Sequence, residues 1–470
     1  MPLPGELFAA LEREASRSLS FWRRLTGAQL LAGSFLALVL VGTVLLLTLP
    51  GLYTGDRLGL IDALFTATSA VCVTGLVVVD TATYFTPFGQ GVLLSLVQLG
   101  GLGTLTLTSV MILGLGGRLT LRSEAVFAGG GIVPEVDTGR LLRSILRYTF
   151  AIEAAGAFLL WIAWGPELGA LSAIWPAIFH AVSAFCNAGF SLFSDGLARF
   201  TGQPATLVVF MSLVVLGGLG FLVLEELVIW RRARGTIRLS LYTRLVLLST
   251  AALILGGALL FLLFEWSNTF SGLAWWARPI EALFLSTMPR SSGFSTIDYG
   301  EVTSASLFLT MLLMFIGGSP GSTAGGLKTT TVAVLVALAI ARLRGRTHVD
   351  AFGRTIPEAT IQRAVGLVIL VLALYAVGFF VLQLTELGGV PFPRVQDRWV
   401  EIAFESVSSL NIVGLSLGAT TELSVAGKLT VAALMFIGRV GPLTLAASMA
   451  VAAERARVHY RFASEDVIIG

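Results

Sequence analysis

The sequence is short of charge. Asp, Glu, Lys and Arg together make up 13% of the 470 residues, which is about half their share in an average soluble domain. Apolar residues make up 55% of the chain, and the mean hydropathy is +0.87. A water-soluble surface needs more charge than this, and a disordered chain needs fewer apolar residues. The composition therefore excludes both classes and predicts an all-α polytopic membrane protein.

Cysteine and histidine are also scarce. The two cysteines, Cys72 and Cys186, provide neither a disulfide framework nor a four-cysteine metal site. The three histidines lie far apart in the sequence and do not suggest a metal cluster. No small-residue cleavage site follows the amphipathic start of the chain, so we expect no removable signal peptide.

Most of the 31 basic residues lie in five clusters. Cytoplasmic segments of membrane proteins are enriched in Lys and Arg, so we expect these clusters, and with them both termini, to be cytoplasmic. Orientation in the membrane explains the clusters, and no nucleic-acid partner is needed. The predicted cytoplasmic segments are 1–24, 118–147, 231–244, 342–363 and 455–470.

Four apolar blocks separate these clusters, namely 25–117, 148–230, 245–341 and 364–454. Each block begins and ends on the same side, so it crosses the membrane an even number of times. Each has apolar runs at its start and its end that reach the roughly 20 residues a spanning helix needs, with a shorter apolar stretch between them. This predicts a helix, a half-membrane re-entrant helix and a second helix in each block, and eight transmembrane helices in all.

The short stretches repeat one another. They read LFTATSAVCVTGL (64–76), IFHAVSAFCNAGF (178–190), ALFLSTMPRSSGF (282–294) and AFESVSSLNIVGL (403–415). The helices that follow also repeat, as LVQLGGLGTLTL (96–107), LVVLGGLGFLVL (213–224), LMFIGGSPGSTA (313–324) and LMFIGRVGPLTL (434–445). Two motifs in the same register four times over predict four pseudo-symmetric units around a central ion pore.

Each re-entrant stretch ends at a glycine: Gly75, Gly189, Gly293 and Gly414. Glycine adopts positive φ without strain, which lets the backbone turn its carbonyl oxygens toward a pore axis. Rings of such carbonyls replace the hydration shell of a permeating cation. We therefore expect these four glycines to line the pore. For Gly100, Gly217 and Gly438 in the following helices, close helix packing is the alternative to pore lining.

The last helix of the third block is interrupted. Ala305–Ile316 and Val332–Ala341 are apolar but too short to span, and a run of Gly, Ser and Pro separates them. We predict that this run is an intramembrane gate, with a passive packing kink as the alternative. Leu327 stands between Gly326 and Lys328, so the run is not a phosphate-binding loop. The predicted gate residues are Gly317, Gly318, Ser319, Pro320, Gly321, Ser322, Thr323, Ala324, Gly325, Gly326 and Lys328.

Arg439 lies deep in a predicted spanning helix, where an arginine is expected to be paired or functional. We predict that it faces the pore below the re-entrant glycines, hydrogen-bonds carbonyls of the 317–328 loop and belongs to the gate. A structural ion pair is the alternative. Arg290 is expected to brace the third re-entrant segment through a pore-helix carboxylate such as Glu405, with contact to ions as the alternative. Glu153 is expected to have either an arginine partner or a water-filled crevice.

These motifs resemble the Ktr/Trk/HKT potassium-transporter superfamily, and most closely its bacterial Ktr membrane subunits. The segments TSAVCVTGL, SAFCNAGFS, PRSSGFST and NIVGLS carry the resemblance, together with FIGGSPGSTAGGLKTTT (315–331). No additional helix pair precedes the first pore segment, which favours the Ktr type. The resemblance covers nearly the whole chain.

The resemblance implies a selectivity filter made of three residues from each unit. Gly75 stands where sodium-selective plant relatives have a serine, which favours potassium. The other filter residues differ between units, so a sodium-permeable or weakly selective transporter is the alternative. The implied filter residues are Val73, Thr74, Gly75, Asn187, Ala188, Gly189, Ser291, Ser292, Gly293, Ile412, Val413 and Gly414.

The resemblance also implies potassium uptake across the cell membrane, often stimulated by sodium, with K⁺ held by filter carbonyls and no organic cofactor. The implied assembly is a homodimer in lipid, bound to a cytoplasmic ring of nucleotide-binding regulatory subunits, and the tail 462–470 docks at the dimer interface. An intramembrane enzyme is not expected, because only His180 is available as a catalytic base. A proton-coupled symporter is disfavoured because the pore motifs carry no titratable carboxylate.

Overall fold

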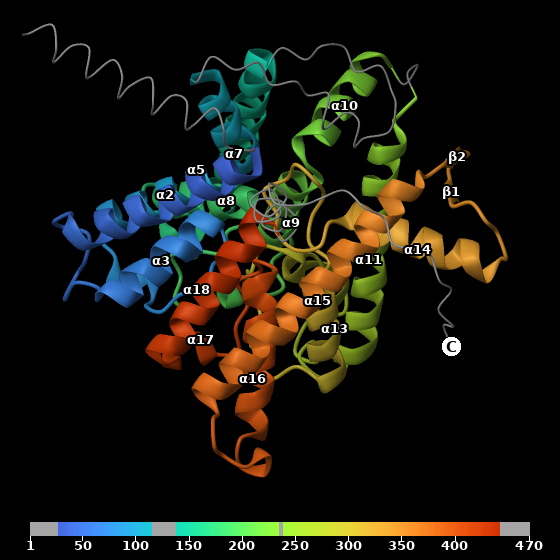
Figure 1. Ribbon diagram of the computed structural model, residues 1–470. Helices are drawn as coiled ribbons and strands as arrows, with labels where there is room; N and C mark the ends of the chain where they lie inside the picture. The colour runs from blue at the N-terminus through green and yellow to red at the C-terminus, as the bar shows by residue number, and fades with distance from the viewer. Residues whose placement is uncertain (1–26, 115–137, 235–237, 442–470) are drawn as a thin grey trace, which may run out of the picture.

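A computed structural model of the chain describes residues 27–114, 138–234 and 238–441. The regular secondary structure of these ranges is almost entirely helical (Figure 1), and their one sheet is the short hairpin β1 (Asp350–Ala351) and β2 (Arg354–Thr355). The basic clusters near both termini and the tail 462–470 lie outside the described residues, as do parts of the loop after the first block.

Four helices in the described ranges are long and apolar enough to cross a membrane, and a bent helix pair is a fifth candidate. The four belong to the starts of the four predicted blocks. Many of their large apolar side chains, such as Leu40, Leu263 and Ile369, are exposed, as expected for helices that face lipid. The four helices are α2 (Gly27–Thr48), α7 (Thr138–Leu168), α11 (Leu241–Glu265) and α15 (Glu358–Glu386).

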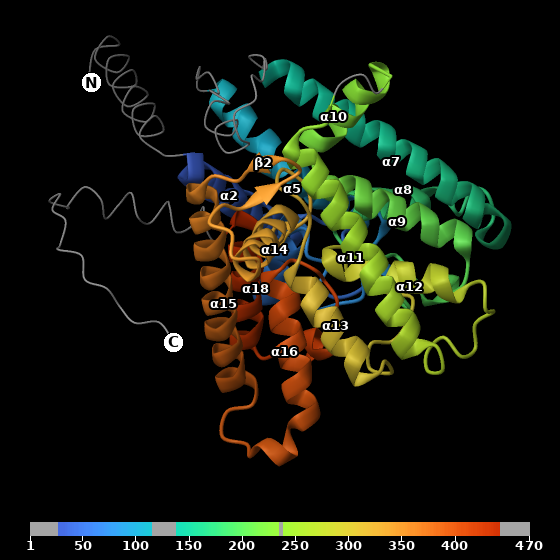
Figure 2. The same ribbon diagram turned by 90° about the vertical axis from the view of Figure 1, so that its right-hand side faces the viewer.

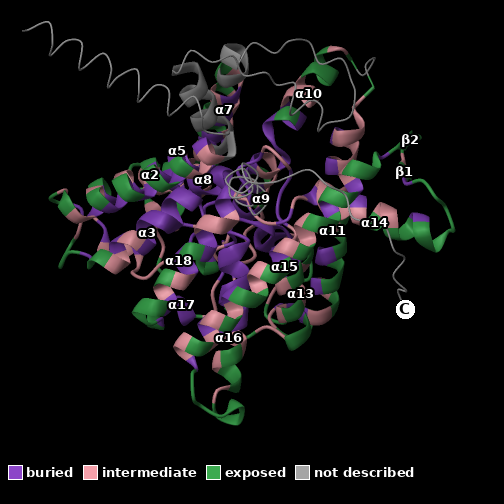
Figure 3. Cartoon of the chain, viewed as in Figure 1, coloured by how far each residue is buried: buried purple, intermediate pink, exposed green. Residues whose placement is uncertain are grey.

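A shorter helix packs against each of these long helices, and Figure 2 shows one such pair, α15 and α16, side by side. Buried residues concentrate at the C-terminal ends of the short helices, in the centre of the molecule (Figure 3). The short helices are α3 (Leu60–Cys72), α8 (Ile174–Cys186), α12 (Arg278–Thr287) with η2 (Met288–Arg290), and α16 (Gln396–Leu410).

The helices that follow differ from one unit to the next. The first unit has one continuous helix, and the third has two helices joined by the 316–328 segment, so the predicted interruption is confirmed. The second unit has a bend of 101° at Gly220 that the sequence did not reveal. The helices are α5 (Pro87–Gly114), α9 (Pro204–Leu219) with α10 (Phe221–Arg232), α13 (Ser304–Phe315) with α14 (Thr329–Leu343), and α18 (Val425–Val440).

The bend at Gly220 has a local cause. Gly220 has φ +87°, which favours glycine. A methyl group at Gly220 would lie 2.7 Å from the carbonyl oxygen of Pro320, and the amide of Phe221 donates to the carbonyl of Gly321 at 3.2 Å. The helix therefore breaks where the interrupted segment of the third unit packs against it.

Several helix starts are fixed by capping side chains. The hydroxyls of Ser240, Thr303 and Ser424 accept the backbone amides three residues ahead, at 3.1–3.3 Å, and begin α11, α13 and α18. The remaining short elements lie in the connections: α4 (Thr81–Tyr84), η1 (Ala198–Phe200), η3 (Phe392–Arg394) and α17 (Ala419–Glu422).

Candidate functional site

The four segments that the sequence predicts to be re-entrant, called the re-entrant segments below, meet in a closed ring at their glycines. All four glycines have positive φ, from +68° to +95°. A methyl group on any of them would lie 2.0–2.7 Å from the carbonyl oxygen that precedes the glycine of the next segment, so only glycine fits. The contacts close on themselves, as Gly75 to Ala188, Gly189 to Ser292, Gly293 to Val413 and Gly414 to Thr74.

Three of the segments leave their helix in the same way. Val73, Asn187 and Ile412, two residues before the glycine, have φ of +57° to +61°. Their backbone amides, and those of the next residues, donate back to carbonyls in the last turn of the helix, a common way to end one. This left-handed conformation is unusual for the β-branched Val73 and Ile412, so the surrounding structure has to hold them in it.

The third segment departs from this pattern. Its helix ends in the turn Met288–Arg290, which contains Pro289, and Ser291 has φ of 166°, an extended conformation. The amides of Ser291 and Ser292 both donate to the carbonyl of Met288, at 3.3 and 3.0 Å. The ring is therefore similar in all four units but not identical.

A hydroxyl residue lies six positions before each ring glycine, a feature that sequence reasoning missed. Ser69 and Ser408 accept the amide of Gly75 at 3.1 Å and that of Gly414 at 3.0 Å. Ser183 donates to the carbonyl of Phe190 at 2.8 Å. Aligning the four repeats on their glycines would have found these residues, because Thr287 occupies the same position in the third unit.

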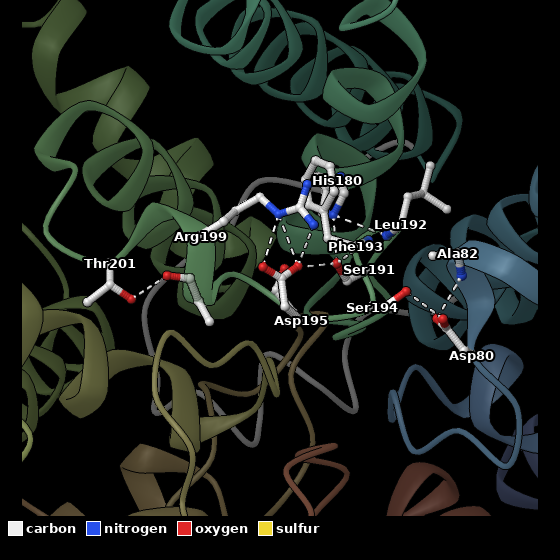
Figure 4. Close-up of polar contacts among 12 residues, drawn as sticks. Asp80, Ala82, His180, Ser191, Leu192, Phe193, Ser194, Asp195, Arg199 and Thr201 are labelled. Atoms are coloured by element: carbon white, nitrogen blue, oxygen red, sulfur yellow. Dashed lines mark hydrogen bonds and ion pairs between the residues drawn. The ribbon is translucent and has the colours of Figure 1, made fainter. Parts of the chain in front are cut away.

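The chain just beyond the ring glycines is held by buried polar side chains. In the second unit, His180 Nε2 lies 3.0 Å from Ser191 Oγ and accepts the amide of Leu192 (Figure 4). In the fourth unit, Glu405 is nine residues before its glycine, as His180 is, and accepts the hydroxyls of Ser416 at 2.8 Å and Thr420. Both side chains therefore brace the residues that follow the ring glycine of their own segment.

The loop after the ring glycine of the second unit is also tied to the first unit. Ser194 donates to Asp80 Oδ2 at 2.6 Å, and Arg199 makes a bidentate pair with Asp195, at 2.8–3.1 Å (Figure 4). The hydrogen bonds and charge of Arg199 hold the pKa of the Asp195 carboxyl below its usual range. These contacts fix the loop above the ring.

The 317–328 loop lies against residues of three units. The amides of Ser319 and Thr323 donate to the carbonyls of Gly218 and Gly217 in the second unit, at 2.9 and 3.3 Å. Tyr242 donates its hydroxyl to the carbonyl of Pro320 at 2.8 Å, and methyl groups on Gly325 would lie within 2.8 Å of Ile412 and Asn411. Lys328, a predicted gate residue, donates to the carbonyl of Ala324 within the loop at 2.8 Å.

Arg439 makes the contact that the sequence predicted. Its guanidinium donates to the carbonyl of Thr323 in the loop at 2.5 Å and to the carbonyl of Gly100 in α5 at 2.6 Å. It is 6% exposed, and no carboxylate pairs with it within the described residues. The alternative of a structural ion pair is therefore not observed there, and its role in gating stays a prediction.

The prediction for Arg290 was wrong. Arg290 donates to the carbonyl of Gly317, at 3.3 Å, whereas Glu405 accepts hydroxyls of its own unit. The pairing was not readable from the sequence because it depends on how the loop folds back. Glu153 has no arginine partner among the described residues, because it accepts from Gln98 at 3.2 Å and lies 3.9 Å from the Cys186 sulfur. The other alternative, a water-filled crevice, stays a prediction.

The helix glycines pack closely against the re-entrant segments. A methyl group on Gly100, Gly217 or Gly438 would lie within 2.0 Å of the carbonyl oxygen four residues before the ring glycine of the same unit. The alternative of close packing is thus the one these contacts support. In the third unit, Gly317 instead meets the carbonyl of Gly325 in its own loop.

One side chain of the ring is left without a partner. The hydroxyl of Thr74 is fully buried and makes no hydrogen bond within the described residues. A buried polar atom in this state is destabilising unless a water molecule or an ion meets it. Together with four closely spaced backbone carbonyls, it makes the ring an oxygen-rich site, which is the ligand chemistry of hard monovalent cations.

Comparison with known proteins gives a consistent result. The family described as TrkH, cation transport protein, matches residues 17–459. The potassium/sodium uptake protein NtpJ of Enterococcus hirae is 38% identical, over 95% of this chain and 98% of that protein. The Ktr system potassium uptake protein B of Bacillus subtilis is 37% identical, over 93% and 96%. These relatives are cation transporters, not enzymes.

A solved structure supports the fold alone. The crystal structure of the potassium transporter TrkH from Vibrio parahaemolyticus matches with a TM-score of 0.67 and 21% identity, covering 88% of this chain and 84% of that one. The resemblance drawn from the pore motifs is confirmed by the family match and by the relatives. The chain belongs to the TrkH family of cation transport proteins.

Proposed function

We propose that this chain is a channel-like potassium-uptake subunit, in which K⁺ passes through the ring of re-entrant segments. The observation that carries the proposal is the closed circuit of contacts in which each ring glycine abuts the carbonyl of the next segment. Backbone carbonyls in such a ring replace the water around K⁺, and the C-terminal ends of the short helices add partial negative charge. The relatives' names, potassium uptake and potassium/sodium uptake, support the same class.

In this proposal the protein has four units around one pore, each with a spanning helix, a re-entrant helix and a second spanning helix, eight in all. The filter residues are the three that end at each ring glycine, and K⁺ is the transported ion rather than a resident cofactor. The unpartnered hydroxyl of Thr74 supports this assignment, because an ion or water in the pore gives it a partner.

The 317–328 loop is the gate in this proposal, and Arg439 and Arg290 hold it in place. Their guanidinium groups donate to the carbonyls of Thr323 and Gly317, at the middle and the start of the loop. Hydrogen bonds from charged donors are stronger than neutral ones, so these contacts are suited to a latch. A deletion within Gly321–Gly326 is expected to raise flux, and unchanged flux would argue for a passive kink.

The proposed setting is the cell membrane, with both termini cytoplasmic. We propose a homodimer regulated by a cytoplasmic ring of nucleotide-binding subunits, with sodium as a stimulating ion. Two relatives are named Ktr system potassium uptake protein B, and the word system supports a transporter that works with other components.

The test is rubidium uptake into liposomes that contain the purified chain, with potassium or sodium as competitor. We expect potassium to block uptake far better than sodium, and Gly75→Ser to lose that preference because a side chain enters the ring. Equal block by both ions in the wild type would favour the alternative, a sodium-permeable or weakly selective transporter of the same architecture. That alternative rests on the differing filter residues and on the potassium/sodium name of one relative.

A further inference from the structure

Every polar group of Thr323 is engaged. Its amide donates to Gly217 O at 3.3 Å, and its carbonyl accepts from Arg439 at 2.5 Å. Its hydroxyl donates to Phe185 O at 3.1 Å and accepts from Asn187 Nδ2 at 2.8 Å. The residue is 1% exposed, so each bond is shielded from water. Thr323 is therefore the point at which the loop is most completely bonded to its surroundings.

Asn187 is the filter residue in this group of bonds. It lies two residues before Gly189, and it is 1% exposed. Val73 and Ile412 hold the equivalent positions with the same left-handed backbone, but their side chains have no polar atom. Within the described residues, Asn187 is the filter residue whose side chain hydrogen-bonds to the loop.

We infer that the bond between Asn187 and Thr323 couples the ion preference of the filter to the position of the gate loop. The inference rests on the proposed function and deepens it. When the loop leaves its place, the Asn187 amide loses its 2.8 Å hydrogen bond to Thr323 and keeps only the 3.3 Å one to Phe185 O, which itself loses the Thr323 hydroxyl as a donor. A buried amide that has lost its shorter hydrogen bond shifts or takes a new partner. Asn187 and Thr323 are thus positioning residues, and the coupling acts in both directions.

The backbone of the second segment limits the size of the effect. The amides of Asn187 and Ala188 donate to the carbonyls of Ala184 and Ser183, at 3.1 and 2.7 Å, and these bonds do not involve the loop. When Thr323 moves away, the Asn187 side chain therefore shifts, and the backbone of the second segment changes locally without unfolding.

The hydroxyl is tested with two variants of Thr323 in the rubidium assay. Thr323→Val keeps the shape of the side chain and removes its hydroxyl, whereas Thr323→Ser keeps the hydroxyl. Because a neutral hydrogen bond is worth about a factor of two to ten in an equilibrium, we expect Thr323→Val to raise uptake and lower the preference for potassium over sodium by roughly that factor. Thr323→Ser is expected to match the wild type in both uptake and ion preference. A valine variant with wild-type preference overturns the inference.

The pair is tested by combining Thr323→Val with Asn187→Gly, which removes the amide and keeps a residue that accepts positive φ. The two changes delete the same bond, so we expect the double variant to alter the ion preference no more than the stronger single variant does. Fully additive effects would show that the two residues act independently and would overturn the coupling.

A control separates this bond from general loosening of the loop. Ser322 is the neighbouring loop residue, and its hydroxyl donates to Ser319 O, within the loop, at 2.6 Å, with no other partner in the part of the chain that the structure describes. Ser322→Ala is expected to leave the ion preference unchanged whatever it does to the uptake rate. An equal loss of preference in Ser322→Ala and Thr323→Val would overturn the inference.

The outcomes also distinguish the inference from the proposed function. If the wild type shows no preference for potassium, the proposed function fails. If the wild type prefers potassium and Thr323→Val keeps that preference, only the coupling fails. Thr310→Val, which removes a buried hydroxyl that donates to Ser306 O in α13, serves as the control for correct folding, checked by thermal unfolding.

Discussion

The re-entrant segments and the helices that follow them are repeated four times in the sequence, but only the first set keeps a common structure. The re-entrant segments all bring a positive-φ glycine to one ring. The following helices are continuous in α5, bent at Gly220, interrupted in the third unit, and ended by Gly441 in the fourth. Four similar copies are needed where the units build one ring, whereas among the described residues the loop comes from the third unit.

The divergence has a steric basis. Gly100, Gly217 and Gly438 each let a helix pass within contact of a re-entrant segment. Gly317 holds the same place in the sequence repeat, but its neighbour is Gly325 of its own loop. One run of Gly, Ser and Pro is enough to turn a packing helix into a folded loop, because proline removes an amide and glycine does not favour the helix.

The largest effect is expected from a substitution that disrupts the packing of a helix glycine against its re-entrant segment. A methyl group on Gly217 would lie 1.9 Å from Phe185 O, whereas nothing lies within 4 Å of one on Gly218. We expect Gly217→Ala to destabilise the protein by roughly 3 kcal/mol or more, and the adjacent Gly218→Ala to leave stability unchanged or raise it slightly. Thermal unfolding in detergent compares the two, and equal melting temperatures would contradict the packing contact.

The next effect concerns the loop alone. Arg439→Gln removes charged donors from the carbonyls of Thr323 and Gly100. Since such bonds contribute about 1.5–3 kcal/mol each, we expect rubidium uptake to rise by roughly tenfold or more. Uptake and ion preference that both match the wild type would contradict the latch.

A smaller effect is expected from the hydroxyl residues six positions before the ring glycines, and it tests how alike the units are. Ser69→Ala and Ser408→Ala each leave a ring-glycine amide without its acceptor, so we expect similar losses of ion preference, of about 1 kcal/mol in discrimination. Thr287→Val is expected to have less effect, because its hydroxyl bonds to Leu283 O of its own helix. A loss of ion preference in only one of the two serine variants would contradict equivalent roles for the two units in the ring.

The smallest effect lies in the loop after the ring glycine of the second unit. Arg199 lowers the pKa of Asp195, so their pair stabilises the fold above the usual Asp pKa, and this contribution is lost as the pH falls through the lowered value. Both side chains are about 40% exposed, so we expect Arg199→Gln to cost well under about 1 kcal/mol at neutral pH. The difference in unfolding free energy from the wild type should shrink in acid; a difference that grows there would contradict the assignment.

The sequence predicted the features that depend on repetition and composition. The ring glycines recur in register, and the last helix of the third unit is interrupted by a run of Gly, Ser and Pro. Arg439 stands out because charge is rare in a membrane helix. Its contact with the loop is present in the structure. The family was likewise readable, because its motifs are long and cover most of the chain.

Features that depend on contacts between distant segments were not predictable. The bend at Gly220 needs the carbonyls of Pro320 and Gly321 from another unit, and glycine is common throughout this chain. The partners of Arg290 and Glu405 depend on how the loops fold back, so matching opposite charges in the sequence gave the wrong pair. The recurring hydroxyl at the position of Ser69 was readable but is easily lost among many Ser and Thr residues.

The most direct test of the ring as the ion site is anomalous diffraction from crystals of the protein soaked in thallium or rubidium, which substitute for potassium. We expect an anomalous peak enclosed by the carbonyls of Thr74, Ala188, Ser292 and Val413, and a weaker or absent peak in Gly75→Ser. A strong peak elsewhere along the chain, with none in the ring of a protein that takes up rubidium, would contradict it.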